Sequence, residues 1–193
     1  MLVNFLRRAH SGWNTALSFL RLLLPRCVGL RTGAAVRVGS GVEWPLGNLH
    51  NLQIGENVSL GRRGWFYLPL DNRQAKILLG SGTSIGNDFV ITANSSIIIG
   101  NDCLLSYRVT VMDHSHVAGW GIKPVTSGLT EGKAVVIGDR CFIGCNTVIM
   151  PGVQLGANCI VGANSVVTRS FAAGSVVVGA PARLLRNIDA AKI

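Results

Sequence analysis

Aliphatic residues recur at a spacing of six through the C-terminal half of the chain. Between residues 136 and 167 the spacing runs without interruption through Ile137, Ile143, Ile149, Leu155, Val161 and Val167. A fixed short period indicates a repeat architecture and is considered before individual helices or strands. A period of six suits neither an α-helix nor an amphipathic strand that pairs with a distant partner. It predicts a parallel β-helix, in which each hexapeptide forms one flat side of a triangular coil and its aliphatic residue points into the prism.

Two further positions of each repeat support this architecture. Glycine follows four of the six aliphatic residues, and we expect it to supply the backbone angles needed at the corners of the coil. A second small or aliphatic residue stands two positions before the next aliphatic residue and should share the interior. These residues are Cys141, Thr147, Val153, Cys159 and Ser165.

Composition is consistent with one solenoid domain. Of the 193 residues, 48% are hydrophobic and only 14% are charged, and 24 are glycine. A disordered chain would contain fewer aliphatic residues. The five cysteines show neither the spacing of a zinc site nor that of a secreted disulfide framework, which favours a reducing, cytoplasmic location.

The chain is basic, with 18 Lys and Arg against 9 Asp and Glu and a net charge of +9. Such an excess attracts nucleic acid, an anionic membrane surface or a phosphorylated ligand. The basic residues form no long run, and no platform of interleaved aromatic residues accompanies them. We therefore favour a membrane surface or a phosphorylated ligand, and we expect no nucleic-acid partner.

Residues 1–32 are predicted to form a separate, helical segment that is apolar and basic. Its longest uncharged stretch, residues 9–20, is shorter than the roughly 20 residues that a membrane span requires. Residues 1–25 suit an amphipathic helix on the inner face of a membrane. The alternative is that they pack against the prism or against a neighbouring subunit.

The repeat domain is assigned to residues 33–172, and residues 173–193 form a C-terminal extension. The period is interrupted at residues 62–76, which contain three consecutive aromatic residues. The largest interruption is a protruding loop over residues 112–135, and a loop of this length is usually functional or disordered. Two of the four histidines of the chain lie in this loop, so we expect the chemistry there.

The period, the histidine loop with its Asp113-His114-Ser115-His116 sequence, and the terminal run Gly179-Ala180-Pro181-Ala182-Arg183 together resemble the hexapeptide-repeat acyltransferases. Within that family the chain is similar to the maltose and galactoside acetyltransferases and to bacterial polysaccharide O-acetyltransferases. The resemblance implies a left-handed β-helix, a homotrimer and acetyl-CoA as co-substrate. It also implies acetyl transfer to a sugar hydroxyl, in a bacterial surface polysaccharide or its lipid-linked precursor.

Transfer to a hydroxyl requires a base, because a hydroxyl is a poor nucleophile at neutral pH, and histidine is the usual choice. The resemblance assigns this role to His114, with His116 as the rival and Asp113 as the group that orients the imidazole. Candidate contacts to the acceptor are Asp88 and Asn94 on earlier coils and Trp120 in the loop.

The resemblance also places coenzyme A along the C-terminal coils, between neighbouring prisms. The backbone N–H of Cys145 would meet the thioester oxygen and that of Ala163 the pantetheine arm. An aromatic residue, Phe142, stands where the galactoside enzyme has tryptophan. At the phosphate and adenine end of coenzyme A, the resemblance places cations suited to phosphate oxygens. The residues assigned to the phosphate and adenine end are Thr168, Arg169, Arg183 and Arg186.

Three alternatives accompany this interpretation. Carbonic anhydrases of the γ class use the same prism with three histidine ligands to zinc, but His10 and His50 lie outside the matched repeats, so we expect no metal. An acetyltransferase of a small acceptor, an amino sugar or serine, is the second. A non-catalytic scaffold is the third, and it is disfavoured because it needs neither the histidine loop nor the C-terminal arginines.

Overall fold

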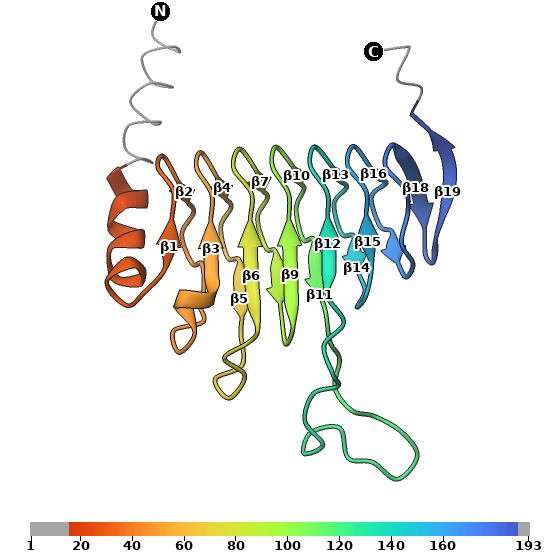
Figure 1. The fold of residues 1–193 in the computed structure, drawn as a ribbon, viewed down its shortest axis with the longest axis horizontal. Helices are drawn as coiled ribbons and strands as arrows, with labels where there is room; N and C mark the ends of the chain where they lie inside the picture. The colour runs from red at the N-terminus through yellow and green to blue at the C-terminus, as the bar shows by residue number, and fades with distance from the viewer. Residues whose placement is uncertain (1–15, 189–193) are drawn as a thin grey trace, which may run out of the picture.

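The computed structural model describes residues 16–188 and shows a single row of stacked coils (Figure 1). Each complete coil contributes one strand to each of three parallel sheets, which form the sides of a triangular prism. A helix over residues 16–27 lies at the N-terminal end of the row, and an antiparallel hairpin closes the C-terminal end. The predicted parallel β-helix is confirmed.

Sheet A contains, in order, β1 (Arg31–Thr32), β3 (Leu52–Ile54), β6 (Lys76–Leu79), β9 (Ser96–Ile99), β12 (Val135–Ile137) and β15 (Gln154–Leu155). Sheet B contains β2 (Arg37–Val38), β4 (Ser59–Leu60), β7 (Ser84–Ile85), β10 (Leu104–Leu105), β13 (Phe142–Ile143), β16 (Ile160–Val161), β18 (Ser175–Gly179) and β19 (Ala182–Asn187). Sheet C contains β5 (Trp65–Tyr67), β8 (Val90–Thr92), β11 (Thr110–Met112), β14 (Val148–Ile149) and β17 (Val166–Val167). A short 3₁₀ helix, η1 (Leu49–Asn51), precedes β3.

The core consists of the residues that the six-residue period selects. All six aliphatic positions between residues 137 and 167 are at most 2% exposed, and the five second positions are equally buried. Equivalent positions pair in register from coil to coil, as Ile143 pairs with Val161. The buried polar members bond to the next coil: the Thr147 hydroxyl donates to the Gly162 carbonyl at 3.2 Å. Aliphatic burial along the whole prism is therefore the main stabilising term.

The reason given above for the repeat glycines is wrong. Neither Gly138 nor Gly144 has a left-handed φ. That conformation falls two residues later, on Arg140 and Asn146, with φ of 55° and 57°. A Cβ atom on Gly144 would instead lie 2.5 Å from the backbone nitrogen of Ala163 on the next coil. The repeat glycines are therefore required because adjacent coil backbones approach too closely for a side chain.

The interruptions of the period all leave the prism at one corner. Residues 68–75 connect β5 to β6 and residues 113–134 connect β11 to β12, so both follow a strand of sheet C and precede one of sheet A. Figure 1 shows them projecting from the same edge, the longer one farthest. We call residues 113–134 the long loop.

The two ends of the prism are covered differently. Ser18 and Leu22 of the helix are buried against the first coil, and Arg21 donates to the Val38 carbonyl at 2.7 Å. Predictions that concern residues 1–15 lie outside the described residues. Within residues 16–188 no helix combines the length and the apolar character needed to cross a bilayer. At the other end, β18 extends sheet B beside β16, so the prism continues past residue 172.

The close approach at Gly144 yields a prediction for stability. Gly144→Ala should lower the free energy of unfolding by at least about 1 kcal/mol, because the added methyl group displaces the backbone of the next coil. Gly119→Ala in the long loop is the matched control, since its new Cβ meets only the flexible Ile122 side chain, at 3.3 Å. Urea and thermal unfolding measure both variants, and equal effects would contradict the explanation.

Candidate active site

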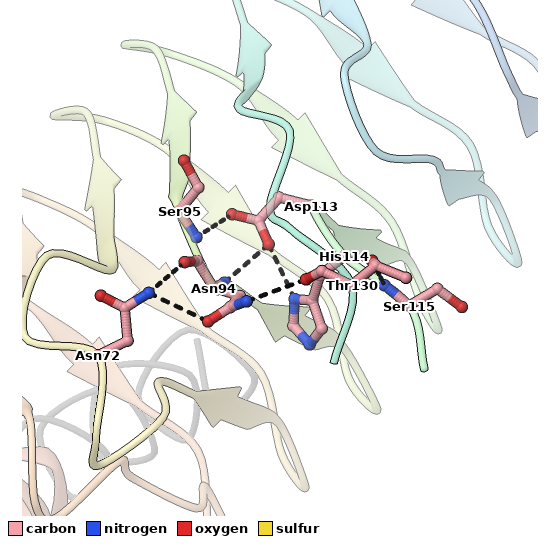
Figure 2. A network of polar contacts seen from close by, with 7 residues as sticks. All are labelled: Asn72, Asn94, Ser95, Asp113, His114, Ser115 and Thr130. Carbon is pink, nitrogen blue, oxygen red and sulfur yellow. Dashed lines mark hydrogen bonds and ion pairs between the residues drawn. The ribbon is translucent and has the colours of Figure 1, made fainter. Parts of the chain in front are cut away.

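The Asp113 carboxylate is held inside the protein at the base of the long loop. Asp113 follows β11 and is fully buried. Its Oδ1 accepts a hydrogen bond from the backbone N–H of Asn94 and its Oδ2 accepts one from that of Ser95, each at 2.7 Å (Figure 2). These two donors belong to the same corner of the preceding coil, between β8 and β9. Because backbone N–H groups only donate, they fix the carboxylate in one orientation as an acceptor.

The imidazole of His114 is oriented by this carboxylate. Its Nδ1 lies 2.8 Å from Asp113 Oδ1. Since the carboxylate accepts, the neutral imidazole carries its proton on Nδ1 and its lone pair on Nε2. The ring of Tyr67 lies beside the imidazole, with 6.3 Å between ring centroids. His114 is 8% exposed, so its imidazole is nearly buried and held in one orientation.

The long loop begins as a short antiparallel ladder that fixes the backbone next to His114. The N–H of Thr130 donates to the Ser115 carbonyl at 2.8 Å, and the N–H of Ser115 donates to Thr130 Oγ1 at 3.0 Å. His116 and Leu129 form an antiparallel bridge one step further out. The loop therefore leaves the prism as a paired stem, which limits the movement of the imidazole.

A second polar network ties this stem to the earlier coils (Figure 2). The Nδ2 of Asn94 donates to the Thr130 carbonyl at 3.1 Å. The Nδ2 of Asn72, from the loop of residues 68–75, donates to the Asn94 carbonyl at 2.7 Å. Three successive corners of the prism are thus joined through side-chain amides. The position of His114 depends on all three.

The imidazole borders a cavity of about 440 Å³ on the outer face of sheet C. The cavity is lined by Trp65, Tyr67, Val90, Thr92, Met112, His114, Ser115, His116 and Leu129. A wider hollow of about 590 Å³ lies along sheet A, but its described lining includes neither histidine nor cysteine. The cavity on sheet C is therefore the candidate active site.

His116 lines the same cavity and is exposed. No carboxylate contact is recorded for its ring among the described residues, in contrast to His114. Geometry therefore favours His114 over His116 as the base.

The structure does not bring the predicted acceptor contacts to this cavity. Asp88 pairs with Arg63 on a neighbouring coil, with two contacts of 2.6 and 2.9 Å, and this hydrogen bonding lowers the pKa of the Asp88 carboxyl. Asn94 supports the stem of the long loop, as described above. Trp120 is fully exposed in the long loop and does not line the cavity.

The predicted coenzyme A contacts fall into two groups. Cys145 and Ala163 occupy the same corner of consecutive coils, and the Asn164 N–H donates to the Cys145 carbonyl at 2.8 Å. Phe142 lies on β13 just before them and is 40% exposed. The remaining predicted contacts to coenzyme A lie apart from this corner. Thr168 and Arg169 follow the opposite end of β17, and Arg183 and Arg186 are exposed on β19.

The corner at Cys145 carries unused backbone donors. At the same corner of an earlier coil, the Arg62 N–H donates to a side chain of the next coil, Asn87 Oδ1, at 2.8 Å. Ala163, which follows Cys145 in the stack, has no side-chain acceptor. Within the described residues no hydrogen bond is recorded for the N–H of Cys145 or of Ala163. These two donors are free to bind a ligand carbonyl.

The base and these free donors lie at opposite ends of sheet C. Cys145 precedes β14, whereas His114 follows β11, and the two strands are neighbours in register. The Asn146 N–H bonds to the Tyr107 carbonyl, so Cys145 is level with residues 106–107. One side of the prism, with β11 at its centre, separates that level from His114, or roughly 15 Å. One chain alone therefore does not place His114 beside the Cys145 N–H.

Sequence reasoning missed Trp65, Tyr67 and Thr130 as residues of the site. Thr130 carries no motif and is recognised only from its contact with Ser115. Trp65 and Tyr67 alternate around the buried Phe66, and this period of two would have placed both on one outer face had the strand been recognised.

Comparison with known proteins agrees with the fold. The family model for bacterial transferase hexapeptide (six repeats) matches residues 134–169. A putative lipopolysaccharide biosynthesis O-acetyl transferase of Escherichia coli, WbbJ, is 33% identical over 147 residues, which cover 72% of this chain and 73% of that protein. The galactoside O-acetyltransferase of Escherichia coli is 31% identical over 137 residues, covering 68% of this chain and 64% of that enzyme.

A solved structure gives the same result. The hexapeptide-repeat acetyltransferase VCA0836 of Vibrio cholerae, in complex with acetyl coenzyme A, superposes with a TM-score of 0.60 at 25% identity, covering 88% of this chain and 76% of that one. The chain belongs to the hexapeptide-repeat acetyltransferase family and is an acyltransferase. Among residues 16–188 no group of three or more His, Cys, Asp and Glu side chains is placed to hold a metal ion.

Proposed function

We propose that the protein transfers an acetyl group from acetyl-CoA to a hydroxyl of a sugar in a bacterial surface polysaccharide or its lipid-linked precursor. The observation that carries the proposal is the Asp113–His114 pair, in which a buried carboxylate orients an imidazole that lines an open cavity. The names of the relatives, a lipopolysaccharide O-acetyl transferase and a galactoside O-acetyltransferase, support a sugar acceptor. The acetyl coenzyme A in the VCA0836 structure supports the donor.

The mechanism follows from the arrangement of the base. His114 Nε2 accepts the proton of the acceptor hydroxyl while the hydroxyl oxygen attacks the carbonyl carbon of the thioester. Asp113 stabilises the imidazolium that forms, and the Cys145 N–H donates to the oxyanion of the tetrahedral intermediate. The carbon–sulfur bond then breaks, and the imidazolium returns its proton to the leaving thiolate. The exposed Arg183 and Arg186 bind phosphates of coenzyme A as charge-assisted donors.

A homotrimer completes this site. Since His114 and Cys145 lie at opposite ends of sheet C in one chain, a second copy must supply one of them. In a closed ring of three chains, each interface joins the same two surfaces of neighbouring chains. Every cleft between chains therefore receives His114 from one chain and the corner at Cys145 from the next. The exposed Phe142 and Leu104 on the outer face of sheet B add apolar surface to that interface.

Replacement of His114 tests the chemistry. His114→Ala should lower kcat at least about a hundredfold and leave the affinity for acetyl-CoA unchanged, because the imidazole acts on the acceptor hydroxyl. Asp113→Asn should lower kcat with the same affinity, since the amide no longer accepts from Nδ1 as a carboxylate does. Steady-state rates with a pyranoside acceptor, together with calorimetric titration of acetyl-CoA, measure both. A His114→Ala variant that retained most of its turnover would exclude this mechanism.

We also propose that the N-terminal helix binds an anionic membrane surface. One side of the helix packs on the first coil, while Phe19, Leu20, Leu23 and Leu24 are 49–66% exposed. The first 42 residues include six arginines and no Asp or Glu. An exposed apolar stripe in a segment that contains arginines and no acidic residues suits a surface of anionic lipid headgroups. A lipid-linked acceptor is found at the same kind of surface.

Vesicle binding tests this partner. The protein should sediment with vesicles that contain phosphatidylglycerol and not with pure phosphatidylcholine vesicles, and a double variant, Leu20→Glu with Leu24→Glu, should lose binding. Val125→Glu is the matched control, because Val125 is 96% exposed in the long loop, away from the helix. Binding that survives the double variant would contradict the membrane role, as would a double variant that changes only the oligomeric state.

A further inference from the structure

Two aromatic side chains on the outer face of sheet C extend the candidate active site. In β5, Phe66 points into the core, where it stacks on Trp44 with 5.7 Å between centroids and meets Phe89 edge-on at 5.0 Å. Because side chains alternate along a strand, Trp65 and Tyr67 both lie on the outside. Trp65 is 43% exposed although it is large and apolar. The buried Phe66 anchors the backbone from which both outer rings project.

These rings form a continuous surface that ends at the catalytic base. The centroids of Trp65 and Tyr67 are 5.8 Å apart, with a tilt of 47° between the rings. Tyr67 is in turn 6.3 Å from His114. All three line the cavity of about 440 Å³, and Thr92, Ser115 and His116 supply polar groups at its edge. An apolar wall with a few polar groups is the usual composition of a small-molecule site.

We propose that Trp65 and Tyr67 form the platform that binds a pyranose ring of the acceptor and directs one of its hydroxyls to His114. This inference rests on the proposed function and adds the part of the protein that recognises the sugar. A pyranose has one face of C–H groups, which are weakly positive and pack on the negative face of an aromatic ring. Its hydroxyls then point outward to the polar edge. The tilted pair fits a ring that contacts both side chains.

The composition of the cavity argues against other occupants. Its described lining contains neither Lys nor Arg, so it offers no cation to the phosphates of coenzyme A. A serine-sized acceptor has no apolar face and would leave the exposed indole without a partner. The platform therefore favours a carbohydrate ring over both.

The test separates the platform from the chemistry. Initial rates are measured with acetyl-CoA and a panel of pyranosides, maltose and methyl galactoside among them, for the wild type and for Trp65→Ala, Trp65→Phe and Tyr67→Ala. Trp65→Ala should raise the KM for the pyranoside at least about tenfold with the KM for acetyl-CoA within about twofold, and Trp65→Phe should recover most of the loss. Phe19→Ala is the control with these soluble acceptors, since Phe19 is an exposed aromatic residue of the N-terminal helix that does not line the cavity.

The outcomes are distinct. A wild type that acetylates serine and no pyranoside contradicts the sugar acceptor itself, and the platform with it. A wild type that acetylates pyranosides, with an unchanged acceptor KM in Trp65→Ala, contradicts the platform alone. A rise confined to the KM for acetyl-CoA, or loss of the oligomer on gel filtration, would assign Trp65 to the co-substrate site or to a subunit contact and overturn the proposal.

Discussion

The close stacking of one coil on the next is the constraint on which the rest of this structure depends. Parallel strands pair at their usual separation only if corner backbones also approach within contact distance, and at Gly144 there is no room for even a methyl group. Interior positions then receive Ile, Val and Leu in register, coil after coil. The stability of such a solenoid is a sum over neighbouring coils, so each corner contributes to the whole.

The same stacking creates the candidate site. Corners of successive coils lie directly above one another, so a carboxylate that follows β11 meets two backbone N–H groups that follow β8. A buried carboxylate needs such donors, because an unpaired one costs several kcal/mol or more. Asp113 is thereby a fixed part of the prism, and His114, which is bonded to it, is held in place as well. The free backbone N–H of Cys145 arises from the same stacking of corners. The residue above it in the next coil is Ala163, whose side chain has no acceptor atom.

The sequence allowed the prism and the histidine loop to be predicted because both depend on local spacing. The six-residue period identifies interior positions directly, and an interruption of that period shows where a loop must leave. The burial of Asp113 could not be predicted, since its partners Asn94 and Ser95 lie 19 and 18 residues away and act through their backbones. Trp65 and Tyr67 were missed because residues 62–76 were assigned to an interruption of the period, whereas Phe66 stands six residues after Leu60 and is buried in β5. The role of the glycines was misjudged because close approach between coils is a three-dimensional property.

The central claim is that the site is assembled from two chains, with the histidine of one beside the donor corner of the next. Mixed trimers of His114→Ala and Ala163→Trp chains test it most directly, since Ala163 is exposed and a bulky side chain there should block the donor corner without disturbing the core. Each variant alone should be inactive. If the chains mix at random in equal amounts, about one site in four receives both intact halves, so co-expressed trimers should recover about a quarter of the wild-type activity. Mixed trimers that remain as inactive as either parent would contradict the account.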